Sequence, residues 1–158
     1  FTSDKDLLQI VDTRVNVVLP GKAGERVGPE QVAAKWGVTP ERMVDLLALV
    51  GDASDNVPGV PGIGPKTAAG LIARFGAVAN IWARLDEIEQ PRLRQSLAES
   101  RALVENNMRL IALDLDVDCG FRWDQASGAK PDPGRLIPFF ERLEFHSMVK
   151  ELSAQELL

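Results

Sequence analysis

The stretch LALVGDASDNVPGVPGIGPKTAAGLI, residues 47–72, places two aspartates, a loop rich in glycine and proline, and a lysine close together. Apolar residues lead into the loop, and small and apolar residues follow it at helical spacing. This pattern predicts a helix, a tight turn and a second helix. Gly62 and Gly64 permit backbone conformations that are closed to other residues, and Ile63 between them is expected to be the buried plug of the turn.

The same stretch does not match either of two common nucleotide-binding motifs. A phosphate-binding loop of the GxxxxGK[ST] type needs Gly directly before Lys, but here Pro65 lies between Gly64 and Lys66. A dinucleotide fingerprint fails as well, because Thr67 occupies the position of its third glycine and no strand precedes the loop. The sequence therefore gives no support for a mononucleotide or dinucleotide site.

The helix that follows the turn is expected to begin at Pro65, since proline is favoured in a first helical turn. The first N–H groups of a helix have no partner inside it, and with the helix dipole they attract an anion. A nucleic-acid phosphate suits such a site, because amide contacts position a strand without reading its bases. Lys66 would add a charged contact and Thr67 a hydroxyl group. A helix–helix turn without any ligand is the alternative interpretation.

Two pairs of aspartates are candidate ligands of a divalent cation. Asp52 and Asp55 lie on one face if the chain is helical or turn-like there. Asp4 and Asp6 lie on one side if their segment is extended. Hard ions such as Mg²⁺ and Mn²⁺ take carboxylate oxygens. The alternatives are an Asx turn for the first pair and capping of the DLLQIV helix for the second.

Composition limits the classes of function. The 158 residues are enough for about one ordinary domain, and no stretch approaches the roughly 20 apolar residues of a membrane helix. The net charge of −5 disfavours indiscriminate binding to a polyanion, so any contact with nucleic acid must be local. No secretory signal is visible, and the single Cys119 fits a reducing cytoplasm. Cytoplasmic location and no membrane partner are the expectations.

The rest of the chain is predicted to be mainly helical with a small β portion. Proline at the first position and glycine after the last position predict helices near 29–36 and 40–50. A β-hairpin is expected near 15–27. A helical pattern over 92–113, broken near Asn106 and Asn107, follows a short helix after Gly76. Residues 114–123 are predicted to be strand-like or extended, and two helices separated near 144–146 are predicted for the rest of the chain. His146, Cys119 and the three tryptophans Trp36, Trp82 and Trp123 are expected to have structural roles.

Three segments together resemble a known family. These are TSDKDLLQIV from Thr2, VGPEQVAAKWGV from Val27, and VDLLALVGDASDNVPGVPGIGPKTAAGLI from Val44. They resemble the C-terminal half of the 5'-3' exonuclease domain of bacterial DNA polymerase I and its stand-alone relatives, a family that includes the flap endonucleases. The segment GDASDNVPGVPGIGPKTA is the most specific part of this resemblance.

The resemblance implies a helix-three-turn-helix module, similar to a helix-hairpin-helix, attached to the remnant of an α/β nuclease fold. It implies that Asp4, Asp6, Asp52 and Asp55 are catalytic and bind Mg²⁺ or Mn²⁺. It also implies that the loop residues contact duplex DNA with 5' ends or flaps, and that the loop carbonyls can hold K⁺. The implied DNA-binding residues are Gly59, Gly62, Ile63, Gly64, Lys66 and Thr67.

The expected division is 1–27 for the end of the nuclease sheet and the hairpin, 28–113 for the DNA-binding region, and 114–158 for the C-terminal segment, all in one compact unit. The resemblance also implies an N-terminal half with further acidic ligands, which these residues do not include, and a polymerase domain in the same or another chain. We therefore expect a metal-dependent 5'-3' exodeoxyribonuclease or structure-specific endonuclease whose fragment 1–158 is inactive alone. A non-catalytic DNA-binding module and a purely structural helical domain remain as alternatives.

Overall fold

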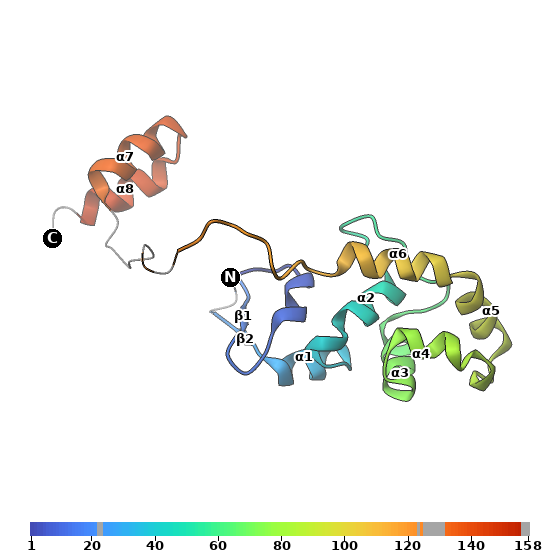
Figure 1. The fold of residues 1–158 in the computed structure, drawn as a ribbon. Helices are drawn as coiled ribbons and strands as arrows, with labels where there is room; N and C mark the ends of the chain where they lie inside the picture. Colours follow the sequence, from blue (N-terminus) through green and yellow to red (C-terminus); the bar gives the residue numbers. More distant parts are fainter. Residues whose placement is uncertain (22–23, 123, 125–131, 156–158) are drawn as a thin grey trace. The chain divides into compact units, whose positions relative to one another are not determined.

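One apolar helix lies at the centre of the larger part of the molecule. In α2 (Met43–Val50), the side chains of Met43, Leu46 and Leu47 are at most 1% exposed. Full burial of each such side chain stabilises the fold by about 1.5–3 kcal/mol. Helices α6 (Arg101–Ile111) and α3 (Pro65–Phe75) pack against α2, as Figure 1 shows. The core is therefore built around the helix that leads into the glycine-rich loop.

The computed structural model describes residues 1–21, 24–122, 124 and 132–155. The chain divides into two units, Phe1–Leu115 and Asp116–Leu158, whereas the sequence led us to expect one. The described residues are mostly helical, as predicted. No helix in the described ranges has the length and apolar character needed to cross a bilayer.

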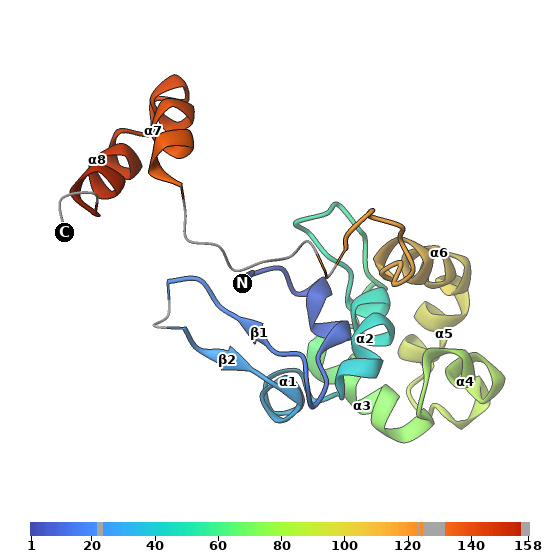
Figure 2. The same ribbon diagram turned by 60° about the vertical axis from the view of Figure 1, so that its left-hand side comes forward.

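The first unit begins with a short 3-10 helix and the predicted hairpin. Helix η1 (Asp6–Ile10) precedes two antiparallel strands, β1 (Val17–Val18) and β2 (Arg26–Val27), in which Val17 lies opposite Val27. Helix α1 (Pro29–Trp36) follows at the end of the hairpin (Figure 2) and ends at Gly37, which has a left-handed conformation. These elements confirm the small β portion and the helix predicted at 29–36.

The helix–turn–helix prediction is confirmed. A single 3-10 turn, η2 (Pro40–Arg42), leads into α2, and α3 begins at Pro65 and is followed by Gly76. Two short helices, α4 (Val78–Ala83) and η3 (Leu85–Glu87), then lead to α5 (Pro91–Glu99). Ile63 is 5% exposed, which makes it the buried plug that the pattern predicted.

The predicted break near Asn106 and Asn107 is wrong. The chain instead breaks at Ser100, between α5 and α6, where the N–H group of Ser100 donates to Ser96 and Leu97. Asn107 lies fully buried inside α6, and its Nδ2 donates to the carbonyls of Ala48 at 3.1 Å and Pro58 at 2.7 Å. The tertiary role of this asparagine explains why a polar residue is accepted in the middle of the helix.

The second unit is a pair of helices, α7 (Pro133–Arg142) and α8 (His146–Gln155), which pack on each other. Their separation near 144–146 was predicted. Residues 113–122 contain no strand. Cys119 is exposed, Trp82 donates its indole N–H to the carbonyl of Leu97, and Trp36 packs partly buried against the core. Trp123 lies outside the described residues.

We expect Asn107→Ala to lower the free energy of unfolding by about 2–3 kcal/mol, because the buried carbonyl of Ala48 and the part-buried carbonyl of Pro58 lose their donor and a small cavity forms. Urea denaturation followed by circular dichroism measures the change. The exposed neighbour Asn106 supplies a matched control, since Asn106→Ala should stay within about 0.5 kcal/mol of the parent. Equal effects of the two substitutions would contradict this role of Asn107.

Candidate metal centre and phosphate-binding turn

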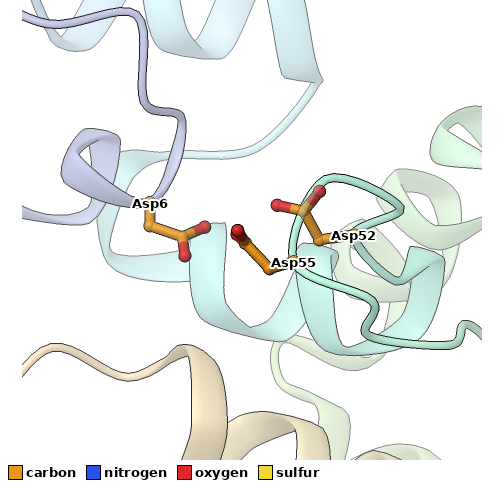
Figure 3. A group of neighbouring side chains, drawn as sticks. All are labelled: Asp6, Asp52 and Asp55. Atoms are coloured by element: carbon orange, nitrogen blue, oxygen red, sulfur yellow. The ribbon is translucent and has the colours of Figure 1, made fainter.

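Three of the four predicted aspartates converge. Asp6 begins η1, and Asp52 and Asp55 lie in the loop after α2. Each offers a carboxylate oxygen, and these oxygens lie within 4.8 Å of one another. Figure 3 shows the carboxylate groups of Asp6 and Asp55 directed at each other, with Asp52 beside them. Segments far apart in the sequence thus form one acidic group.

Asp4 lies beside this group without joining it. Its Oδ1 accepts the N–H of Asp6, the first residue of η1, at 3.0 Å, whereas the N-cap position of η1 is occupied by Lys5. Asp4 also lines a hollow of about 330 Å³ together with Asp52 and Asp55. Its charge therefore acts on the group although its oxygens are not in the cluster.

The ionised form of Asp6 is disfavoured by its surroundings. Burial raises the pKa of its carboxyl group, and the charges of Asp4, Asp52 and Asp55 raise it further, while Lys5 opposes them. Its Oδ1 is buried and has no hydrogen-bond partner within the described part of the chain. An oxygen-only set with an unsatisfied buried oxygen fits a hard divalent cation such as Mg²⁺ or Mn²⁺.

Asp52 has the opposite environment. Its side chain is 3% exposed, and its Oδ1 lies 2.5 Å from Lys5 Nζ. The same oxygen accepts the N–H and the hydroxyl group of Ser54 at 2.9 and 2.5 Å, which forms the Asx turn considered from the sequence. Lys5 and Ser54 lower the pKa of Asp52 from 3.8 to about 2. The Asx turn and the acidic cluster therefore coexist.

Sequence reasoning missed Lys5 as part of the site. It lies between Asp4 and Asp6, and its Nζ also donates to Ser54 Oγ at 3.3 Å. The available signal was the cation inside the SDKD segment. Ser54, one of the partners of Lys5, lies 49 residues further along the chain. The local pattern around Lys5 therefore could not predict which groups it contacts.

The loop between α2 and α3 closes through two glycines. Gly51 has φ 79°, and a Cβ atom there would lie 2.4 Å from the amide nitrogen of Gly59. A Cβ atom on Gly59 would lie 2.0 Å from the carbonyl oxygen of Val50. Between them, Asp52 and Val57 exchange two backbone hydrogen bonds of 2.8 Å. The loop returns so closely to its start that no side chain fits at either position.

Helix α6 supports both segments that carry the acidic group. Gln9 of η1 donates to the carbonyl of Ile111 and accepts the N–H of Leu113, both at 3.1 Å. Asn107 holds the end of α2 and the loop at Pro58. The middle of α6 thereby holds the loop, and the C-terminal end of α6 with the residues just after it holds η1.

Residues 60–64, the second half of the loop, lead to the exposed start of α3. Val60 donates to Leu49 at 2.8 Å and Ile63 donates to Val60 at 3.0 Å, which uses these two amides internally. The N–H groups of Lys66 and Thr67 have no protein acceptor among the described residues. Four of the six residues predicted to bind DNA are exposed: Gly62, Gly64, Lys66 and Thr67. Ile63 is buried and Gly59 is half-buried at the close approach of the loop to Val50.

One further cation lies beside this turn. Arg92 of α5 lines a hollow of about 220 Å³ with Gly62 and Thr67. The hydroxyl group of Ser96 donates to the carbonyl of Pro61 at 2.6 Å and holds α5 against the turn. Arg101 of α6 instead pairs with Glu105 at 2.9 Å.

Residues 38–134 match the family model described as 5'-3' exonuclease, C-terminal SAM fold. The chain is similar to the thermostable DNA polymerase I of Thermus thermophilus, with 39% identity over 156 residues, which cover 99% of this chain and 18% of that protein. It is also similar to the 5'-3' exonuclease of Aquifex aeolicus, with 35% identity over 152 residues, which cover 96% and 51%. The chain thus spans about half or less of the length of these relatives.

Solved structures of a bacteriophage T5 enzyme share the fold. The T5 5'-exonuclease with bound divalent zinc ions has a TM-score of 0.63 and 27% identity, covering 68% of this chain and 40% of that chain. A T5 flap endonuclease in a pseudo-enzyme-product complex with DNA and metal ions has a TM-score of 0.62 and 26% identity, with the same coverage of both chains.

Gly59→Ala is expected to destabilise the protein by about 3 kcal/mol or more, because the added methyl group meets the backbone of Val50. Gly70→Ala is the matched control. A methyl group there has nothing within 4 Å, and alanine inside a helix is more favourable than glycine by about 0.5–1 kcal/mol. Urea unfolding of both variants tests the loop closure, and a Gly59→Ala protein as stable as the parent would refute it.

Removal of the charge of Asp52 and removal of the charge of Asp6 should have opposite effects on stability in EDTA. Asp52→Asn should lower stability at pH 7 by on the order of 1 kcal/mol, since Lys5 and Ser54 lose a charged partner. Asp6→Asn should raise it, because burial and neighbouring negative charge disfavour the ionised form.

The depressed pKa of Asp52 implies a contribution to stability that is present above pH 3.8 and is lost as the pH falls towards about 2. The Asp52→Asn variant should show a smaller loss of melting temperature over this range. Thermal unfolding between pH 7 and 2 checks both variants, with the exposed Asp86→Asn as a control of equal charge change. Stabilisation by Asp52→Asn would contradict the ion pair.

Proposed function

This chain belongs to the family of 5'-3' exonucleases and matches the part described as the C-terminal SAM fold. We propose that it is part of a divalent-metal-dependent 5'-3' exodeoxyribonuclease or flap endonuclease of DNA replication and repair. The observation that carries the proposal is the convergence of Asp6, Asp52 and Asp55 within 4.8 Å. The loop that supplies two of these aspartates also leads to the exposed start of α3.

The three converging aspartates would hold one Mg²⁺ or Mn²⁺, with Asp4 adding negative charge nearby. A divalent ion supplies a Lewis acid for hydrolysis of a phosphodiester bond. The buried and unsatisfied Oδ1 of Asp6 supports this assignment, because binding a cation would offset the cost of burying the charged group. The bound metal ions of the T5 enzymes support a divalent ion of some kind.

The exposed turn would hold the backbone of duplex DNA that has 5' ends or flaps. The free N–H groups of Lys66 and Thr67, the dipole of α3 and the Lys66 ammonium all favour a phosphate. Such contacts carry no base information, so recognition would depend on duplex shape and strand ends. A K⁺ ion held by the turn carbonyls is part of the same proposal, on the basis of the family resemblance.

The chain alone is proposed to bind DNA weakly and to cut it slowly or not at all. Cleavage of this kind commonly uses two ions about 3.5–4 Å apart, and three or four carboxylates give too little negative charge to offset the repulsion between them. Because similar proteins include DNA polymerase I, a polymerase domain in the same or another chain is the proposed partner.

The second candidate is a non-catalytic DNA-binding module. The exposed turn favours it, but the net charge of −5 does not, since a protein that only binds DNA gains affinity by neutralising phosphates. The two candidates differ in one respect. A metal centre predicts that the aspartates bind a divalent ion, whereas a binding module predicts that they only cap and order the loop.

Two substitutions should separate metal binding from DNA binding. Asp55→Asn should weaken Mn²⁺ binding by about tenfold or more and leave the affinity for a 5'-flapped duplex nearly unchanged. Lys66→Ala should leave Mn²⁺ binding unchanged, weaken duplex binding several-fold and reduce the dependence of log K on log salt by about 1. Calorimetry measures the ion, fluorescence anisotropy measures the DNA, and Lys150→Ala in α8 is the control.

The outcomes distinguish the candidates. If the chain binds the duplex but the Asp55→Asn variant binds Mn²⁺ as well as the parent does, the metal centre is refuted and the non-catalytic module is favoured. If Lys66→Ala and Lys150→Ala bind the duplex equally well, the assignment of the turn fails. Rapid cleavage of the flapped duplex by residues 1–158 with Mg²⁺ would refute the proposal that the chain alone is inactive.

A further inference from the structure

Lys5 is the one residue of the acidic hollow whose charge opposes a bound metal ion. Its side chain is 27% exposed and its Nζ lies 2.5 Å from Oδ1 of the buried Asp52. Lysine ammonium groups normally remain in water because their hydration is strong. A lysine directed into an acidic hollow, with Asp4, Asp52 and Asp55 on its walls, therefore calls for an explanation beyond solubility.

The contacts of Asp52 show what Lys5 does in this structure. Oδ1 of Asp52 accepts three donors: the ammonium of Lys5 and the N–H and hydroxyl groups of Ser54. These donors compensate for burying this carboxylate, which is 3% exposed. Asp6 receives no comparable donor on its Oδ1. Lys5 thus neutralises one of the three converging acids and leaves another uncompensated.

We propose that Lys5 is a resident counter-ion of the metal centre, which neutralises Asp52 when the divalent ion is absent and competes with that ion for the same carboxylate. This inference rests on the proposed function. It makes Lys5 a positioning residue that acts through Asp52. The arrangement keeps the loop folded without metal, and it lowers the affinity of the centre for its ion.

The competition follows from the geometry. A divalent ion shared by Asp6, Asp52 and Asp55 must come within coordination distance of Asp52, whose Oδ1 is already in contact with an ammonium group. Two cations at one carboxylate repel each other strongly where water is partly excluded. Either the ammonium moves away or the ion binds with the opposing charge beside it. Both routes weaken metal binding relative to a neutral residue at position 5.

The test compares Lys5→Met, Lys5→Arg and Lys150→Met with the parent by titration with Mn²⁺ alone, following the free ion by electron paramagnetic resonance. Methionine keeps the length of the side chain and removes the charge. We expect Lys5→Met to lower the Kd for Mn²⁺ roughly tenfold, the scale of one charge-assisted hydrogen bond. Lys5→Arg and Lys150→Met should stay within about twofold of the parent, since both keep the charge next to Asp52.

Stability separates this role from a merely structural one. In EDTA the Lys5→Met variant should melt at a lower temperature than the parent, because Asp52 loses its partner. Saturating Mn²⁺ should then raise its melting temperature by more than it raises that of the parent. A structural role predicts a lower melting temperature together with weaker or unchanged Mn²⁺ binding, and that result would overturn the inference.

A measurement on the unaltered chain covers the case in which Lys5→Met does not fold. The ammonium signal of Lys5 in ¹H–¹⁵N NMR spectra should change on addition of Mg²⁺, whereas the signal of Lys150 should not. An unchanged Lys5 signal at saturating Mg²⁺ would overturn the inference and leave the metal centre intact. If none of the proteins binds Mn²⁺, the proposed metal centre itself fails, and the role of Lys5 fails with it.

Discussion

The crossing of the chain at Gly51 and Gly59 is the constraint on which both parts of the candidate site depend. A Cβ atom on either glycine would lie within 2.4 Å of backbone atoms of the other strand of the loop, so the loop can close only where both side chains are absent. This closure returns the chain to the end of α2 after residues 52–57. Val60 then donates its N–H group to the carbonyl of Leu49 in α2. Asp52, Asp55 and the start of α3 are therefore positioned by the same closed loop.

The acidic group formed by Asp6, Asp52 and Asp55 destabilises the folded protein locally. Asp6 keeps a buried oxygen without a partner, beside three other carboxylates. The fold tolerates this because α6 holds both segments in place, through Gln9 at η1 and Asn107 at the loop. A natural fold that retains such an unfavourable arrangement against a well-packed core is typical of a functional site. The compensation is expected from the ligand.

The structural and functional interpretations of the aspartates are not exclusive. Asp4 accepts the N–H of the first residue of η1 and Asp52 closes an Asx turn with Ser54, as their sequence contexts allow in any protein. The same contacts also orient carboxylates toward a common hollow. Capping therefore does not argue against a metal centre. The evidence for the centre comes from the convergence of segments distant in sequence and from membership of the 5'-3' exonuclease family.

Local signals determined much of the fold. Proline at the start and glycine after the end located α1 and α3, and residues 144–146 were correctly placed between the last two helices. These features depend on backbone preferences of residues near each other in the chain. The spacing of the four aspartates made them candidate ligands, and the family resemblance implied their catalytic role, which stays a prediction.

Only the tertiary structure decided which groups meet. The break at Ser100, the burial of Asn107 and the division into two units differ from the expectations because each depends on packing between distant segments. The pairing of Lys5 with Asp52, and the separate position of Asp4, were also invisible in the sequence. An amino-acid pattern specifies the charges and the local backbone, but the pairing of charges is set by the three-dimensional path that the core imposes on the chain.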